Sequence, residues 1–485
     1  MIRRALIIAS AVGALAAAVS GCGSSAKSPL DDSLGYFPKT VPVVVAVNTN
    51  LKDSQYHQLD TLLKRFPFYG LLKQRFTQQL NAGGTRTSFA ELKPLLGNPL
   101  VVGFPHVGSS TNQTVVTWKT KDGKKAEDLV KRNGQKIGSE EGASVYQESS
   151  GNTTAVKGDT IISAKSRALV DAALKQRGKD DRLREDTFKS ALTGLPSDNI
   201  ASVYGNFETL LGSGRAAAAK KVPWVGALRT FGSTVTSASD GVVIDFRAKT
   251  EGSLSSSQLP IASGGASPPV VRRSNEVGIG LRDPAQTVKF AEQALEASSP
   301  QVALAKSTVS HVLGVDIDKD VIGALGSESA ASVSLGGSVV FRSDLKNPGQ
   351  FKKTLATIAK NLPKAGSLAQ GATLTPGPNG LYQFKPRSGK PEYIGVAGNR
   401  LVIGDDPNRA VKFANETATA VPGGTGALVV ALDPKGIATE LLKKQGGATG
   451  AALGGAFVAP LKDFTGHVQS ETSGLTARFK LTISG

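Results

Sequence analysis

Among the residues whose chemistry can be read from their neighbours, Cys22 stands out, because it is the single cysteine in 485 residues. It follows Val19-Ser20-Gly21, and Arg3-Arg4 precede an almost wholly apolar run over residues 5–19. A thiol is a nucleophile when ionised. Small side chains just before it suit the narrow cleft of a peptidase that holds an extended backbone. The spacing predicts cleavage between Gly21 and Cys22 and covalent modification of the thiol.

The four positions 19–22 resemble the lipobox of bacterial lipoproteins, in which diacylglycerol is joined to the cysteine sulfur as a thioether. The resemblance implies a signal peptide over 1–21, then a lipidated Cys22 at the start of a flexible tether over 22–36. Two or more acyl chains anchor a protein stably. We therefore expect a folded body outside the cytoplasmic membrane, in the bacterial cell envelope and bound to the membrane through its N-terminal lipid.

Other interpretations of this segment fit less well. A structural cysteine would lie in a patterned core segment, whereas residues 23–29 have the composition of a linker. A permanent transmembrane helix needs about 20 apolar residues, and this run is shorter. Arg3-Arg4 also suggests twin-arginine export, but Ala5-Leu6-Ile7 match that signal poorly, so the general secretory route is favoured.

Side chains that commonly carry catalysis are sparse and scattered. The four histidines are too far apart for a local metal motif; they are His57, His106, His311 and His467. The sequence contains no P-loop, no dinucleotide fingerprint and no Gly-x-Ser-x-Gly elbow, and the body holds no cysteine nucleophile. We expect no cofactor, no metal and no enzymatic activity. A hydrolase with an unrecognised active site is the enzymatic alternative.

Asp316, Asp318 and Asp320 alternate in a way that suggests a calcium loop. The sixth position of that loop requires glycine and the twelfth requires glutamate, but this chain has Val321 and Ser327 there. Acidic residues are also favourable at a helix N-terminus. The pattern therefore favours a structural role before a short helix.

The chain is strongly basic, with a formal charge of +18. No aromatic and basic residues interleave as in strand-binding proteins, so nucleic acid is not an expected partner. Anionic lipid headgroups or wall polymers are the expected acidic neighbours. Cations are concentrated in one segment, at Lys119, Lys121, Lys124, Lys125, Lys131, Arg132 and Lys136. The simpler interpretation is a solvated helix face, and the more specific one is a surface that contacts anionic groups.

The body contains an internal repeat. Residues 228–247 (LRTFGSTVTSASDGVVIDFR) match residues 461–480 (LKDFTGHVQSETSGLTARFK) without a gap. Residues 156–162 match 396–402, and Val115-Val116 match Val339-Val340. We expect two tandem homologous domains, unit 1 over 37–251 and unit 2 over 275–485, with a Gly/Ser/Pro-rich linker over 252–274.

Each unit follows the same expected plan. A strand-like run opens it at residues 43–47 or 277–281, and an amphipathic helix follows. A strand then leads into a helix, and hairpins with turn glycines Gly158 and Gly398 come next. Hairpin strands in succession predict an α+β fold, a mainly antiparallel sheet in each domain with helices packed on one side.

Three phrases, FPKTVPVVVAVNTN, LDTLLKRFP and the segment at residues 183–207, resemble an uncharacterised family of bacterial envelope lipoproteins known only as a domain of unknown function. The resemblance is better in the first unit, and it implies no catalytic residues. We expect a membrane-anchored extracytoplasmic lipoprotein with a non-catalytic binding role, carrying an apolar ligand or lipid. An envelope scaffold or protein-interaction module is the alternative in the binding class.

Overall fold

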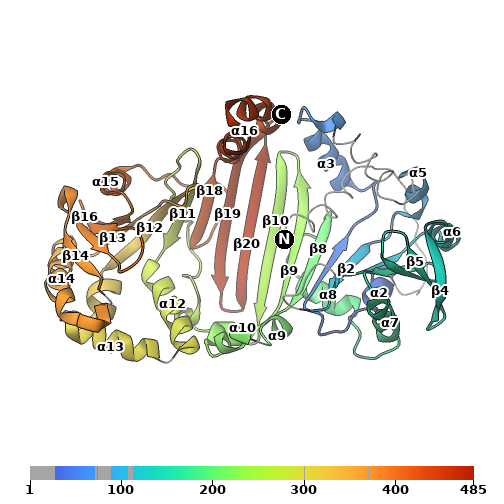
Figure 1. Ribbon diagram of the computed structural model, residues 1–485, viewed down its shortest axis with the longest axis horizontal. Helices are drawn as coiled ribbons and strands as arrows, with labels where there is room; N and C mark the ends of the chain where they lie inside the picture. Colours follow the sequence, from blue (N-terminus) through green and yellow to red (C-terminus); the bar gives the residue numbers. More distant parts are fainter. Residues whose placement is uncertain are drawn as a thin grey trace. The chain divides into compact units, whose positions relative to one another are not determined.

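The computed structural model describes residues 28–71, 74, 89–106, 113–212, 214–299, 301–369 and 371–485. Their strands and helices form an α+β protein with extensive antiparallel pairing (Figure 1). The chain forms two compact units. Unit 1 contains the described residues up to 212, with 229–249 and 482–485, and unit 2 contains 214–228 and 250–481.

Unit 1 is built on one antiparallel sheet. Its strands are β1 (Val43–Val47), β2 (Leu100–Phe104), β3 (Val115–Lys119), β4 (Gly134–Glu140), β5 (Ala143–Glu148), β6 (Thr153–Lys157), β7 (Thr160–Ala164), β8 (Ala201–Asn206), β9 (Leu228–Ala238) and β10 (Gly241–Thr250). Their order across the sheet is β10-β9-β8-β1-β2-β3-β7-β6-β5-β4. The run at residues 43–47 is therefore the strand that the sequence predicts, flanked by β2 and β8.

Helices pack on both faces of the unit 1 sheet. They are α2 (Pro29–Leu34), α3 (Ser54–Leu63), α5 (Phe89–Leu92), η1 (Lys93–Leu95), α6 (Gly123–Asn133), α7 (Arg167–Gln176), α8 (Glu185–Ala191) and α9 (Phe207–Leu210). Successive strand residues point to opposite faces. Thr117 contacts α2, whereas Trp118 packs with Ala126 of α6. The expectation of helices on one side was wrong, because β3 carries buried side chains on both faces.

Unit 2 is built on a further set of antiparallel strands. Its strands are β11 (Glu276–Arg282), β12 (Leu325–Ser334), β13 (Val339–Leu345), β14 (Thr373–Pro376), β15 (Tyr382–Lys385), β16 (Glu392–Ala397), β17 (Arg400–Gly404), β18 (Leu428–Leu432), β19 (Leu461–Glu471) and β20 (Gly474–Ile483). Their order is β20-β19-β18-β11-β12-β13-β17-β16-β15-β14. This order repeats the order in unit 1, strand for strand.

Helices also cover both faces of the unit 2 sheet. They are α10 (Gly214–Ala219), α11 (Pro223–Ala227), η3 (Ser256–Gln258), α12 (Pro284–Ser298), α13 (Gln301–Leu313), the π-helical η4 (Ile317–Ile322), α14 (Pro348–Asn361), η5 (Leu362–Ala369), η6 (Pro378–Gly380), α15 (Pro407–Asn415) and α16 (Pro434–Val458). Phe351 of α14 packs in one core cluster with Leu401, while Phe413 of α15 packs in another with Val402.

The registers of the two sheets agree at the strands that matter for the site. In unit 1, Thr117 lies opposite Val101 and Ile162. In unit 2, Arg342 lies opposite Ala330 and Val402. The turn glycines at 158 and 398 have φ of 61° and 62°, and β7 and β17 each begin two residues later. Arg342 is thus the counterpart of Thr117.

This register corrects one repeat alignment by a single residue. Val115 lies opposite Ala164, and Val340 lies opposite Gly404. The counterpart of Val115 is therefore Val340 and not Val339. A one-residue slip turns every side chain to the other face of a sheet, so the alignment drawn from the sequence would match Arg342 with Trp118 and not with Thr117.

Two segments expected as flexible connections are packed against the units. Residues 29–34 form helix α2, which Ser28 caps by accepting a hydrogen bond from the Asp31 amide. The expected tether over 22–36 is thus folded from residue 28 onward. In the expected linker over 252–274, Leu259 and Val270 are fully buried, and Val270 forms a β-bridge with Thr419. Apolar side chains hold this segment on unit 2 despite its Gly/Ser/Pro content.

Candidate ligand-binding site

Cys22 and the predicted cleavage position Gly21 lie outside the described residues, which begin at 28. The structure therefore adds no geometry to the predicted lipidation site. The first described element after that site is helix α2, whose Ser33 and Leu34 are fully buried in unit 1.

The seven cations expected to contact an anionic surface form local ion pairs in several cases. Lys119, on β3, pairs with Asp32 and Asp159. On and beside α6, three cations pair with acidic residues: Lys125 with Asp122 at 3.0 Å, Lys131 with Glu127 at 3.0 Å and Arg132 with Glu91 at 2.6 Å. Lys121, Lys124 and Lys136 are exposed. The pairing favours a solvated helix face, since α6 buries only Ala126, Leu129 and Val130.

The histidines do not meet one another. His57, His106 and His311 are exposed, and His467 on β19 is only 8% exposed. The His467 Nδ1 lies 3.2 Å from the Ser267 hydroxyl, which also donates to the Gly424 carbonyl at 2.8 Å. Burial lowers the pKa of His467. Because the hydroxyl already bonds to a carbonyl, this pair ties residues 250–274 to the sheet rather than forming a nucleophile and base.

Of the three aspartates, Asp316 and Asp320 bond to the backbone around η4, while Asp318 forms an ion pair. Asp316 caps η4 by accepting a hydrogen bond from the Lys319 amide at 3.0 Å. Asp320 accepts one from the Asp316 amide at 2.9 Å. Lys306 pairs with Asp318 at 2.5 Å. Within the described ranges, no group of three or more His, Cys, Asp or Glu residues is placed to hold a metal ion.

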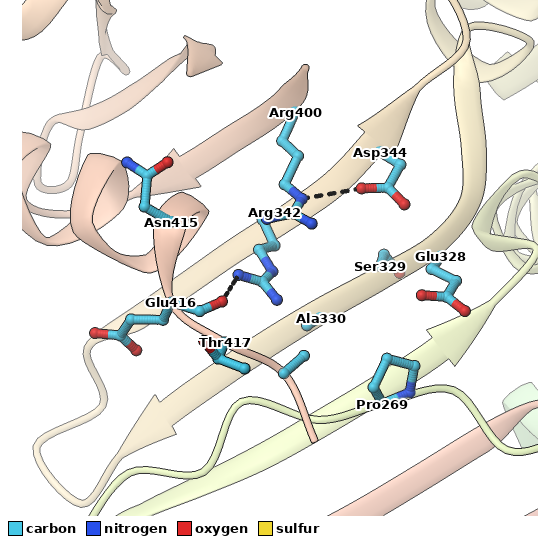
Figure 2. Close-up of a pocket in the computed structure, with 11 residues that line it drawn as sticks. Pro269, Glu328, Ser329, Ala330, Arg342, Asp344, Arg400, Asn415, Glu416 and Thr417 are labelled. Carbon is cyan, nitrogen blue, oxygen red and sulfur yellow. Dashed lines mark hydrogen bonds and ion pairs between the residues drawn. The ribbon is translucent and has the colours of Figure 1, made fainter. Parts of the chain in front are cut away.

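A pocket of about 370 Å³ lies in unit 2, where β12, β13 and β17 meet the end of α15 (Figure 2). We call it the Arg342 pocket. Its volume falls within the range of small-ligand sites. Charged and polar side chains form most of its wall, which consists of Pro269, Glu328, Ser329, Ala330, Arg342, Asp344, Arg400, Asn415, Glu416, Thr417 and Ala418.

Arg342 is a buried cation, only 5% exposed. Its Nη1 donates to the carbonyls of Phe413 at 2.7 Å, Ala414 at 3.2 Å and Glu416 at 2.6 Å. These carbonyls end helix α15, where the helix dipole is negative and favours a cation. Figure 2 shows the other terminal nitrogen of the guanidinium turned toward the cavity. The side chain therefore closes a helix and presents a donor to the pocket.

A second cation, Arg400, lies beside Arg342 at the start of β17. Its Nε donates to Asp344 at 3.0 Å and its Nη1 to the Ala414 carbonyl at 2.6 Å. The Glu416 carboxylate turns away from the cavity in Figure 2, since it accepts two hydrogen bonds from Arg273 at 2.6 and 2.8 Å. Arg342 thus bonds to carbonyls, while Asp344 and Glu416 bond to other arginines. Glu328 is a third carboxylate in the pocket wall.

Burial lowers the pKa of the Arg342 guanidinium and the Arg400 cation beside it lowers that pKa further, whereas the carboxylates of Asp344, Glu416 and Glu328 raise it. The hydrogen bonds from Arg273 lower the pKa of Glu416, so this carboxylate remains ionised. A buried charge is costly unless it is paired and hydrogen-bonded. Asp344 and Glu328 offset part of the repulsion between the two arginines, and a small anion that bonds to both guanidinium groups would offset more of it. The arrangement can therefore bind a small anion at the guanidinium groups.

Few features of the sequence indicate the Arg342 pocket. Arg342 interrupts an apolar strand in SVVFRSDL, which reads as an ordinary charged residue at a strand surface. Only the register of β13 shows that it points to the α15 face together with Val340. A charged residue at an inward strand position was the one available signal, and the misaligned repeat concealed it.

A second, more open hollow of about 650 Å³ lies between α12, α13 and η4. Lys306 crosses it to pair with Glu292 at 3.1 Å and with Asp318. The same helices carry exposed apolar side chains: Leu295 is 57% exposed and Leu304 is 71% exposed. This helical hairpin therefore presents more apolar surface to solvent than a packed element would.

Among the described helices, none is both long enough and apolar enough to cross a membrane.

Comparison with known proteins gives no family. No protein-family model matches the chain, and no curated protein matches it. Solved structures of TP0453 give weak matches. Crystal form III is 8% identical, with 45% of this chain and 79% of that chain covered and a TM-score of 0.26. Crystal form I is 9% identical, with 45% and 78% covered and a TM-score of 0.24. Such low scores carry no argument about fold or function.

Proposed function

We propose that this protein is a membrane-anchored, extracytoplasmic lipoprotein of the bacterial cell envelope with a non-catalytic binding role, and that unit 2 takes an anionic ligand in the Arg342 pocket. The observation that carries the binding role is the buried Arg342 guanidinium, which donates to three backbone carbonyls and has Arg400 beside it. The anchor rests on the sequence around Cys22 and on its resemblance to envelope lipoproteins.

We propose further that the two units arose by duplication. The identical strand order and the matching registers at β3 and β13 support this origin, as do the repeats in the sequence. A charged pocket is present at the Arg342 position, whose unit 1 counterpart is the neutral Thr117.

An anionic ligand fits better than the apolar ligand expected from the sequence. An apolar cargo needs a cavity lined mainly by hydrophobic side chains. The walls of the Arg342 pocket and of the hollow at α13 are instead rich in charged and hydroxyl groups. We therefore place the proposed ligand among small carboxylates or phosphates rather than lipids.

Calorimetric titration of the full mature chain with succinate, phosphate and the neutral compound glycerol tests this proposal. We expect saturable binding of an anion and none of glycerol, and Arg400→Gln should weaken the binding because it removes one of the two cations. Arg387→Gln, at an exposed arginine of unit 2 outside the pocket, is the matched control. Absence of anion binding, or equal loss in both variants, would refute the proposed site.

A second candidate function is protein interaction through the hairpin of α12 and α13. The exposed side chains of Leu295 and Leu304 favour it, because large apolar side chains at a surface are typical of interaction sites. In vivo crosslinking of the full chain should give adducts that Leu304→Glu abolishes while the melting temperature is unchanged. Identical adducts from both proteins would exclude this surface.

A further inference from the structure

Helix α2 packs against the unit 1 sheet at a site formed by Thr117, Lys119 and Arg177, which we call the α2 seat. Thr117 Oγ1 donates to the Ser33 carbonyl at 2.9 Å, and the Lys119 ammonium pairs with the Asp32 carboxylate. Arg177, which follows α7, donates to the same carboxylate at 2.7 Å. An acidic helical turn is thus held against β3 by one hydroxyl and two cations.

The counterparts of these seat residues line the Arg342 pocket. Lys119 lies opposite Thr160, the first residue of β7, and Asp344 lies opposite Arg400, the first residue of β17. Lys119 therefore corresponds to Asp344, and Thr117, two residues earlier, corresponds to Arg342. The helices that follow, α7 and α15, have their N-caps at Ser166 and Asp406. Arg177 and Thr417 lie equally far along the chain from these two N-caps, so they correspond to each other, and Thr417 also lines the pocket.

The chain that precedes the first strand takes a different course in unit 2. In unit 1, α2 lies just before β1 and covers β3. In unit 2, the segment before β11 forms bridges at Ser263 with Ser470 and at Ala266 with Thr425, beside β18 and β19. It reaches the pocket wall only at Pro269. The pocket therefore occupies the place on the unit 2 sheet that α2 fills on the unit 1 sheet.

We propose that the Arg342 pocket is a docking site for an acidic peptide segment of a partner protein, seated as α2 is seated in unit 1. This proposal rests on the proposed function, because it names the anionic ligand of the same pocket. The segment presents an aspartate or glutamate side chain to Arg342 and Arg400, and its backbone lies along β13.

The charges at the two seats explain this choice of ligand. In unit 1, the carboxylate of α2 meets Lys119 and Arg177. In unit 2, the cations are at other positions, Arg342 and Arg400, while Asp344 takes the place of Lys119 and Glu328 adds a second carboxylate to the pocket wall. Hydrogen bonds between guanidinium and carboxylate groups are among the stronger ones in proteins. A pocket of about 370 Å³ has room for a small ligand, so it admits a short turn rather than a domain.

The test uses the full mature chain in detergent and a labelled peptide with the sequence of residues 28–36, acetylated at its start and amidated at its end. Fluorescence anisotropy should report saturable binding. The peptide with both Asp31 and Asp32 replaced by asparagine should bind at least about tenfold more weakly, because it keeps the shape of the turn and loses its charge. Equal binding of the two peptides would overturn the proposal.

Three variants assign the binding to the pocket. Arg400→Gln should weaken peptide binding about tenfold, whereas Arg387→Gln should leave it unchanged. Asp344→Asn should tighten binding several-fold, because it releases Arg400 from its internal carboxylate. Arg342 is left intact, since it also closes α15. Unchanged affinity in both Arg400→Gln and Asp344→Asn would exclude the pocket.

A photoreactive version of the peptide guards against binding elsewhere. Adducts should map to residues 328–344 or 400–418, whereas adducts at residues 115–119 would mean that the peptide displaced α2 in unit 1 and would overturn the assignment. If succinate or phosphate binds the pocket and the peptide does not, this inference alone fails. If none of them binds, the proposed function fails with it.

Discussion

At the scale of single residues, Arg342 combines two roles. It supplies the cation that the carbonyl end of α15 favours, and it exposes its remaining donor to a pocket. The unit 1 counterpart, Thr117, is a neutral hydroxyl that bonds to α2. The difference between a filled seat and an open pocket is thus associated with one strand position.

His467 gives a pH dependence whose sign follows from its burial. Its pKa is lowered in the folded protein, so below the ordinary histidine pKa of about 6.5 the unfolded chain binds the extra proton more readily. Its stabilising contribution is therefore complete above that value and is lost as the pH falls through the folded pKa. Urea unfolding of the wild type and of His467→Gln between pH 7 and 5 should show a steeper loss of stability in the wild type. Parallel curves would contradict the expectation.

At the scale of elements, α2 shows how composition can mislead. The segment after Cys22 begins with glycine and serine, which indicates a flexible tether. Residues 28–34 nevertheless contain the residue types that start a helix. Ser28 is an N-cap, and Pro29 stands at the first helical position. The composition of residues 252–274 also predicts a flexible linker, but the side chains of Leu259 and Val270 are buried among its turn-forming residues and hold the segment in place.

Asp32 should stabilise unit 1 through α2. Asp32→Asn removes the carboxylate that accepts from Lys119 and Arg177, and both ion pairs are partly buried. We expect a loss of roughly 1–3 kcal/mol in the free energy of unfolding, measured by urea denaturation followed by circular dichroism. Asp186→Asn, in the first turn of α8, is the matched control and should change stability by less than about 0.5 kcal/mol. Similar losses in both variants would argue against the seat.

At the scale of the whole molecule, periodicity and repeats predicted the α+β class and most elements. The strands at 43–47 and 277–281 and the gapless match of β9 with β19 lie where the sequence puts them. Helices on both sheet faces were missed, because the alternation in β3 is short and Trp118 and Thr117 are both buried. The pocket was missed because pairing of β13 with β17 sets which face Arg342 occupies, and no local pattern encodes that pairing.

The proposed anchor is a property of the whole chain and has a direct test. Cys22→Ser removes the only thiol and should move the protein from the membrane fraction to the soluble extracytoplasmic fraction, because a protein without acyl chains has lost its stable attachment. Immunoblots of fractionated cells check this. The control, Ser25→Ala, keeps the cysteine and should remain in the membrane. Membrane retention of Cys22→Ser would contradict the lipoprotein assignment.

The position of α2 has a mechanical consequence. Because α2 is the first described element after Cys22, tension applied to the chain from its N-terminal side loads this helix before any other described part of the fold. The ion pairs of Asp32 with Lys119 and Arg177, together with the burial of Leu34, resist this force. A force that broke these contacts would expose the face of β3 under α2 without breaking a strand pairing. In a chain held by the proposed lipid anchor, release of α2 would therefore come before unfolding of the sheet.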